Sequence, residues 1–221
     1  MEKRVFSFIA VWLAVLTGML LAQDFSWEDI GRDNLNCNVL SVNSQDSKII
    51  LAAKPGSILK TENAGKNWRR VLAVKGRSSD INAMAAGADN PNVVYAATGN
   101  GLYYSSNLGE HWERIFRGKT ELENQCTAVF NFKKGIFLGT KAGLFVSKDK
   151  GRSWSKEQAG IGNAYIINID SGLGQNTPVY LAAENGIFKT LDYGQRWEKI
   201  FVSHALERSE ASAMPKPFKP L

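Results

Sequence analysis

The sequence has few of the residues that build disulfide scaffolds, metal centres or extended Pro-rich segments. Its 221 residues include only 2 cysteines, 2 histidines and 6 prolines. Two cysteines can form at most one disulfide, which excludes a small protein held together by several disulfides. The two histidines, His111 and His204, do not form a metal-ligand cluster. The 27 Lys and Arg are interleaved with 21 Asp and Glu, so the net charge of +6 does not indicate a nucleic-acid partner. With 44% hydrophobic residues, the composition predicts a folded domain. No Gly-rich phosphate loop follows a strand into a helix, so no cofactor is expected.

Only one apolar run, from Val5 to Gln23, is long enough to concern a membrane. It follows the net-positive start Glu2-Lys3-Arg4 and passes a small residue at Ala22. We therefore interpret residues 1–22 as a secretory signal peptide, with an uncleaved membrane anchor as the alternative. The protein is then expected to be secreted or periplasmic, with no membrane contact after cleavage.

A repeated octet dominates the rest of the chain. Four segments obey the pattern S/T-x-D/N-x-G-x-x-W, and their tryptophans are about 43 residues apart, a period typical of four-stranded propeller blades. The repeated positions are Thr61, Asn63, Gly65 and Trp68; Ser105, Asn107, Gly109 and Trp112; Ser147, Asp149, Gly151 and Trp154; and Thr190, Asp192, Gly194 and Trp197.

Short β-type segments flank each octet in the same order. An inner strand and an apolar second strand precede it, a third strand beginning after a turn runs into it, and an outer strand starts near its Trp. This order predicts an all-β chain with four units at about 37–71, 81–116, 126–157 and 164–201, within a domain at 23–200. Residues 202–221, with three prolines, are expected to form a flexible tail.

These octets resemble the Asp-box (BNR) repeat of β-propellers, over about residues 37–200. The resemblance implies a propeller of four-stranded blades, as in sialidases, sortilin-type receptors, xyloglucan-cleaving glycosidases and photosystem II assembly and stability factors. Unit two, with Asn100-Gly-Leu-Tyr103 after Asp89-Asn-Pro-Asn-Val-Val-Tyr95, looks most like the assembly factors and related exported proteins. Asn63 and Asn107 stand where that family more often has Asp, which keeps a turn acceptor but removes the charge.

The octet is interpreted as structural rather than catalytic. Its hydroxyl and carbonyl oxygens can accept from turn amides, its Gly supplies an unusual backbone angle, and its Trp buries surface. Phe25–Ile30 resembles an additional outer strand at the N-terminal end. The four units are therefore expected to form an incomplete or open ring; a truncated piece of a larger propeller and an unusually small ring are the alternatives. Open sheet edges would allow self-association.

Function is expected on the face opposite the octets, where the loops between units meet the hairpins between second and third strands. The candidate partner-binding residues on these loops are Arg77, Arg117, Lys119, Lys141 and Glu184. We expect a non-enzymatic scaffold for a protein or peptide. The alternative is a partial or degenerate sialidase-like glycosidase, or a carbohydrate-binding propeller. For the glycosidase, Arg32, Arg77 and Arg117 are candidate arginines, and Asp80, Glu121 and Glu123 are candidate acids.

The two cysteines admit two interpretations. Cys37 and Cys126 stand at the starts of the inner strands of units one and three, and export would permit a disulfide between them. Because non-adjacent blades separate them, we expect buried free thiols instead.

Overall fold

The computed structural model describes residues 37–201, apart from 77, 133–134, 159 and 173–176. The predicted signal peptide, the outer strand expected at Phe25–Ile30 and the tail at 202–221 lie outside the described residues. Within the described part, no helix is long and apolar enough to cross a membrane.

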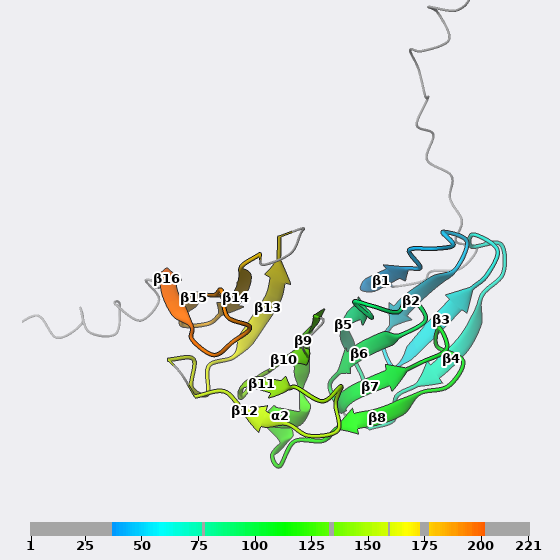
Figure 1. The fold of residues 1–221 in the computed structure, drawn as a ribbon. Coiled ribbons are helices and arrows are strands. Elements are labelled where there is room, and N and C mark those ends of the chain that lie inside the picture. Colours follow the sequence, from blue (N-terminus) through cyan, green and yellow to red (C-terminus); the bar gives the residue numbers. More distant parts are fainter. Residues whose placement is uncertain (1–36, 77, 133–134, 159, 173–176, 202–221) are drawn as a thin grey trace, which may run out of the picture. The chain divides into compact units, whose positions relative to one another are not determined.

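The described chain forms four sheets of four antiparallel strands each, in sequence order (Figure 1). Sheet 1 contains β1 (Val39–Val42), β2 (Ile50–Lys54), β3 (Ser57–Thr61) and β4 (Arg69–Ala73). Sheet 2 contains β5 (Ile81–Ala86), β6 (Val94–Thr98), β7 (Gly101–Ser105) and β8 (Glu113–Phe116). Sheet 3 contains β9 (Cys126–Phe132), β10 (Gly135–Thr140), β11 (Gly143–Ser147) and β12 (Ser155–Lys156). Sheet 4 contains β13 (Ile166–Ser171), β14 (Val179–Ala183), β15 (Gly186–Thr190) and β16 (Glu198–Phe201).

The strand pairing confirms the predicted order of inner, second, third and outer strand in every unit. The second and third strands are rich in β-branched and aromatic residues, which favour the pleated backbone. Every residue of β3, β6, β10 and β11 is buried, and sheets 2 and 3 pack against a neighbouring sheet on each face. In β14 and β15 buried residues alternate with more accessible ones, so sheet 4 has one covered face.

One short helix, α2 (Glu121–Asn124), was not predicted. It lies in the connection between sheets 2 and 3 and begins with a capping box, in which Thr120 and Glu123 exchange side-chain and backbone hydrogen bonds. The sequence Thr120-Glu-Leu-Glu123 carries the capping-box pattern, but the segment is too short to show the hydrophobic periodicity of a helix.

Three hydrophobic clusters join consecutive sheets. Leu51 and Ile58 of sheet 1 pack with Val94 of sheet 2, Leu102 of sheet 2 packs with Leu138 of sheet 3, and Phe137 of sheet 3 packs with Leu181 of sheet 4. The inner strands contact one another in the same order, β1 with β5, β5 with β9, and β9 with β13. Among the described residues, no cluster joins sheet 1 to sheet 4.

The second, third and fourth octets lie at these junctions, each packed on the preceding sheet. A Cβ added to Gly109, Gly151 or Gly194 would meet Leu51, Ile115 or Phe137, respectively. Trp112, Trp154 and Trp197 are partly buried and each packs against one of the three clusters, as expected of rings that bury surface against neighbouring strands.

The two cysteines differ in exposure, and no disulfide joins them. Cys126 is buried and Cys37 is exposed, so the expectation of a buried thiol holds only for Cys126. Burial raises the pKa of the Cys126 thiol well above its usual range, which keeps the thiol protonated and unreactive.

Candidate functional site

All four octets use the same side-chain hydrogen bonds to close their turns. In each, the Ser or Thr hydroxyl donates to the Asn or Asp side chain and accepts from the Gly amide; for Ser147 these distances are 2.9 and 2.7 Å. The same pairs recur at Thr61, Ser105 and Thr190. The Asn or Asp oxygen also accepts the backbone amide of the residue before the Trp, at 2.8 or 2.9 Å. These oxygens thus bond within their own turns.

The two carboxylates of the octets are held ionised by these bonds. Hydrogen bonds from the side chain and backbone of Ser153 lower the pKa of Asp149 to about 2. The backbone amide of Arg196 is the main cause of a lowered pKa at Asp192. A carboxylate with a lowered pKa is a poor proton donor at neutral pH, which disfavours a role as a general acid.

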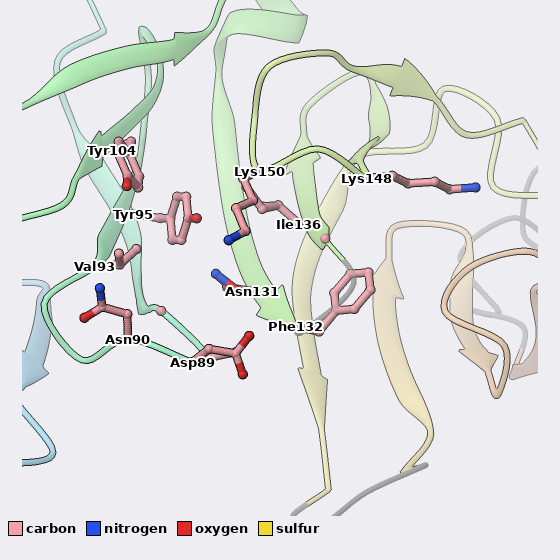
Figure 2. Close-up of a pocket in the computed structure, with 13 residues that line it drawn as sticks. Asp89, Asn90, Val93, Tyr95, Tyr104, Asn131, Phe132, Ile136, Lys148 and Lys150 are labelled. Carbon is pink, nitrogen blue, oxygen red and sulfur yellow. The ribbon is translucent and has the colours of Figure 1, made fainter.

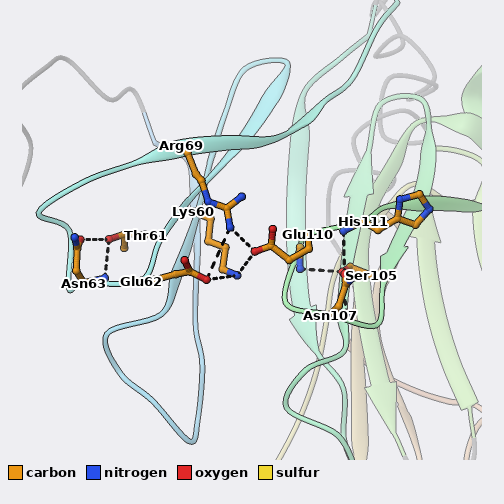
Figure 3. Close-up of polar contacts among 10 residues, drawn as sticks. Lys60, Thr61, Glu62, Asn63, Arg69, Ser105, Asn107, Glu110 and His111 are labelled. Atoms are coloured by element: carbon orange, nitrogen blue, oxygen red, sulfur yellow. Dashed lines mark hydrogen bonds and ion pairs between the residues drawn. The ribbon is translucent and has the colours of Figure 1, made fainter.

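An ionic network connects the octet end of sheet 1 with that of sheet 2 (Figure 3). The Lys60 side chain is only 3% exposed, and its Nζ lies 2.8 Å from Glu62 and 2.5 Å from Glu110 of the second octet. Arg69 also contacts Glu110, and these two cations lower the pKa of the Glu110 carboxyl. The cluster satisfies a buried ammonium group and joins two sheets, which is a structural role.

The candidate functional face lies at the opposite ends of the strands. Because the strands are antiparallel, the hairpins between second and third strands lie at the same end as the connections between sheets. At that end the inner strands of sheets 2, 3 and 4 border a polar cleft of about 350 Å³, which we call the inner cleft. Its lining residues are Ser78, Asp80, Asn82, Gln125, Thr127, Lys141, Tyr165 and Ile167.

Side-chain bonds between neighbouring inner strands hold the inner cleft in place. Asn82 donates to the carbonyl of Cys126 at 2.7 Å, and Thr127 donates to the carbonyl of Ile166 at 2.5 Å. The equivalent position in sheet 4 is Ile167, which is 53% exposed and cannot donate. The cleft therefore combines one cation, one carboxylate, amides, hydroxyls and a small apolar wall.

The structure divides the predicted partner-binding residues among different places. Lys141 lines the inner cleft, and Glu184 borders it by accepting the Tyr165 amide at 2.9 Å. Arg117 and Lys119 instead line a second cleft between sheets 2 and 3, of about 360 Å³, with Glu123, Trp154 and Lys156. Glu123 pairs with Lys156 across this cleft at 3.5 Å. Arg77 lies outside the described residues.

The remaining acid candidates are also separated. Asp80 lines the inner cleft, whereas Glu123 lies in the second cleft and Glu121 is exposed on α2. Arg32 lies outside the described residues. Within the described ranges, no three His, Cys, Asp or Glu side chains lie close enough to hold a metal ion.

Sequence reasoning missed a third cleft of about 430 Å³, at the octet end of sheets 2 and 3 (Figure 2). Tyr95 and Tyr104 form one wall with ring centroids 5.4 Å apart, and Lys150 of the third octet approaches from the other side. Burial raises the pKa of the Tyr95 hydroxyl. In the sequence, Tyr95 and Tyr104 have the pattern of ordinary strand residues, so no sequence signal pointed to this cleft.

Comparison with known proteins identifies the fold. No protein-family model matches the chain, and no curated protein matches it. Among solved structures, an ancestral GH74 enzyme matches with a TM-score of 0.61 and 18% identity over 74% of this chain and 24% of its own. YCF48 from Cyanidioschyzon merolae matches with a TM-score of 0.60 and 12% identity over 82% of this chain and 61% of its own.

A third match is the extracellular domain of the one-component system BT4673 from B. thetaiotaomicron. Its TM-score is 0.56 at 15% identity, over 76% of this chain and 22% of that one. This chain thus spans about a quarter of the ancestral GH74 chain and three fifths of YCF48. Four four-stranded antiparallel sheets with these structural neighbours establish an all-β, β-propeller fold.

Proposed function

We propose that this β-propeller is an exported, non-enzymatic scaffold that holds a protein or peptide partner in the inner cleft. The observation that carries the proposal is the composition of that cleft, where Asp80, Asn82, Gln125, Thr127 and Lys141 gather at the ends of three adjacent inner strands. Mixed donors and acceptors of this kind suit the amide groups and short polar side chains of a peptide. The resemblance of the octets to those of exported assembly factors also supports a binding role.

The inner cleft is lined by two side chains of opposite charge, Asp80 and Lys141, which can be substituted separately. Asp80 and Lys141 are both exposed and border the same space. Charged groups at an accessible rim govern the rate of encounter and the choice of partner more than they govern stability. A partner in this cleft would therefore be sensitive to the sign of each charge.

Affinity capture from the cell envelope tests this proposal. A tagged chain should retain an envelope protein, and Lys141→Glu should reduce that capture at least about tenfold, a loss of about 1.4 kcal/mol. Lys150→Glu, in the cleft at the octet end, is the matched control and should capture normally. Equal capture by both variants, with folding intact, would remove the inner cleft from the partner site.

The second candidate is a glycosidase or carbohydrate-binding propeller. It is favoured by the closeness of two carboxylates to one cleft, since Asp80 lines it and Glu184 bonds to Tyr165 on its wall. Glycoside hydrolysis uses two such groups, one as acid and one as base or nucleophile. The structural likeness to GH74 enzymes also agrees with this alternative.

A panel of fluorogenic sialosides and glucans, including xyloglucan, separates the two candidates. The scaffold proposal expects no turnover above the level of an Asp80→Asn, Glu184→Gln double variant. Turnover that this double variant abolishes would establish the hydrolase instead. Turnover that depends on Arg77 or Glu121 would point to a sialidase-like site.

A further inference from the structure

The third cleft, between the octet ends of sheets 2 and 3, has a counterpart between sheets 1 and 2 that is nearly closed. The strand register and the octet positions match Tyr95 and Lys150 of the third cleft with Leu51 and Leu108. Leu51 and Leu108 line a space of only about 10 Å³, whereas the third cleft has about 430 Å³. The same place in the repeat is therefore closed at one junction and open at the next.

The fourth residue of each octet differs between the junctions. Leu108 lines the nearly closed space between sheets 1 and 2. Tyr193 stacks on Phe132 between sheets 3 and 4, with ring centroids 5.7 Å apart and ring planes at 14°. The third octet has Lys150 instead, which is exposed and forms no ion pair with the described residues. Among the three described junctions, a cation thus replaces an apolar or aromatic side chain at the third cleft alone.

The position of the third octet explains why this cleft is open. The second and fourth octets pack on the second strand of the preceding sheet, at Leu51 and Phe137. The third octet packs instead on the outer strand β8, where its glycine approaches Ile115 and its tryptophan donates to the Ile115 carbonyl at 3.1 Å. Because this octet packs on the outer strand, space remains beside Tyr95 of β6.

The open cleft has an aromatic wall on one side and a cation on the other. Tyr95 is 3% exposed, and its ring centroid lies 5.4 Å from that of Tyr104. Figure 2 shows Lys150 pointing toward Tyr95 and Asn131, whereas Lys148 points away from them. A hollow of this volume, lined by aromatic rings and a few polar groups, is typical of sites for small molecules.

We propose that the third cleft binds a small aromatic carboxylate. The ring of this ligand lies against Tyr95 and Tyr104, where an octet side chain fills the equivalent space at the other junctions. Its carboxylate accepts charge-assisted hydrogen bonds from the Lys150 ammonium group. The site lies at the opposite ends of the strands from the inner cleft, so it is separate from the proposed partner site.

Two polar side chains orient the ligand in the cleft. Asn131 lies next to Lys150 in Figure 2 and offers an amide donor to the same carboxylate. Asp89, on the connection between β5 and β6, also lines the cleft and repels an anion. The carboxylate is therefore expected beside Lys150 and away from that connection.

An NMR titration of the full chain with phenylacetate tests the proposal. Amide signals of Lys150 and Asn131 should shift with a dissociation constant of about 1 mM or lower, the range expected of a small ligand. The amide signal of Lys141, in the inner cleft, should not move. Neutral phenylacetamide and non-aromatic acetate should each bind at least about tenfold more weakly, because each lacks one of the two recognised groups.

Two substitutions at position 150 separate the charge from the space. Lys150→Met removes the charge and should weaken phenylacetate binding at least about tenfold, with phenylacetamide binding changed less than about twofold. Lys150→Tyr introduces the side chain that Tyr193 has in the fourth octet, and it should abolish the shifts from both compounds by filling the cleft. Lys148→Met is the matched control and should bind phenylacetate as the wild type does.

Three results would contradict the proposal. An absence of shifts at about 10 mM phenylacetate would mean that the cleft takes no aromatic carboxylate. Equal affinities for phenylacetate and phenylacetamide would remove the role given to Lys150. Binding that survives Lys150→Tyr would place the ligand elsewhere. Thermal denaturation distinguishes lost binding from misfolding, and the variants should fold because position 150 is exposed.

Discussion

Trp154 differs from the other three octet tryptophans in the hydrogen bonds of its indole. Its Nε1 donates to the carbonyls of Ile115 and Gly151, both at 3.1 Å. The Nε1 atoms of Trp68, Trp112 and Trp197 are buried without a partner among the described residues. One residue type at one repeated position thus makes different contributions to stability.

We expect Trp154→Phe to destabilise the protein by about 1 kcal/mol more than Trp112→Phe, because only the first change leaves bonded carbonyls without their donor. Urea unfolding of both variants measures this difference. Trp154→Ala should cost about 3 kcal/mol, near the lower end of values for a buried aromatic residue, because the ring is only partly covered. Equal losses in the two Phe variants would contradict the role given to the indole bond.

At the scale of the hairpin, two features favour glycine in the octet, namely a positive φ and close packing against the preceding sheet. Gly194 has a φ of 84°, and a Cβ there would lie 2.7 Å from the ring of Phe137, which is fully buried. Gly160 has a φ of 74°, yet a Cβ there would meet nothing within 4 Å. The two positions therefore separate backbone strain from close packing between sheets.

Gly160→Ala should cost about 1 kcal/mol, the strain of a left-handed residue. Gly194→Ala should cost about 1–3 kcal/mol more, because the Phe137 ring cannot move away without disturbing the junction. Thermal or urea unfolding of both variants gives the comparison. If Gly194→Ala lowered the free energy of unfolding no more than Gly160→Ala, close packing of the fourth octet on Phe137 would not contribute to the junction between sheets 3 and 4.

The Asp149 carboxylate of the third octet should make the free energy of unfolding depend on pH in the acidic range. Hydrogen bonds lower the pKa of Asp149 from 3.8 to about 2 in the folded protein. A carboxyl with a lowered folded pKa adds stability that is complete above pH 3.8 and is lost as the pH falls through about 2. Asn63 and Asn107 hold the same position without a charge and contribute no such dependence.

Asp149→Asn should therefore flatten the dependence of unfolding free energy on pH between about 4 and 2, compared with the wild type. Denaturant midpoints measured at several pH values in that window test this. A control variant, Asp89→Asn, changes a surface carboxyl outside the octets and should leave the slope nearly unchanged. An unaltered slope in Asp149→Asn would mean that the pKa of this carboxyl does not differ between the folded and unfolded chain, and would contradict the prediction.

Much of the secondary structure was predictable, because strand alternation and turn residues are features of short stretches of sequence. Strand alternation and the octet residues predicted the order of inner, second, third and outer strand that each sheet has, although β12 is only Ser155–Lys156. The helix α2 was not predicted, because its four residues carry a capping signal without a periodic apolar face. The partial exposure of the tryptophans was also not predictable, since it depends on how far one sheet overlaps the next.

At the scale of the whole described chain, the division of the candidate residues between two clefts was not predicted. Lys141 and Glu184 lie at the inner cleft, whereas Arg117 and Lys119 line the second cleft, between sheets 2 and 3. The contributions of Asn82, Thr127 and Tyr165 were missed. The sequence identified them only as strand residues. They line the inner cleft because neighbouring inner strands lie close together in the fold.

Our proposal assigns the octet end of the strands to building the fold and the loop end to binding a partner. A photo-cross-linking amino acid placed at position 141, and in a second strain at position 150, measures this separation directly in the cells that make the protein. We predict a cross-linked adduct with another protein from position 141 and none from position 150. Adducts from position 150 alone would place the partner on the octet end and contradict the account.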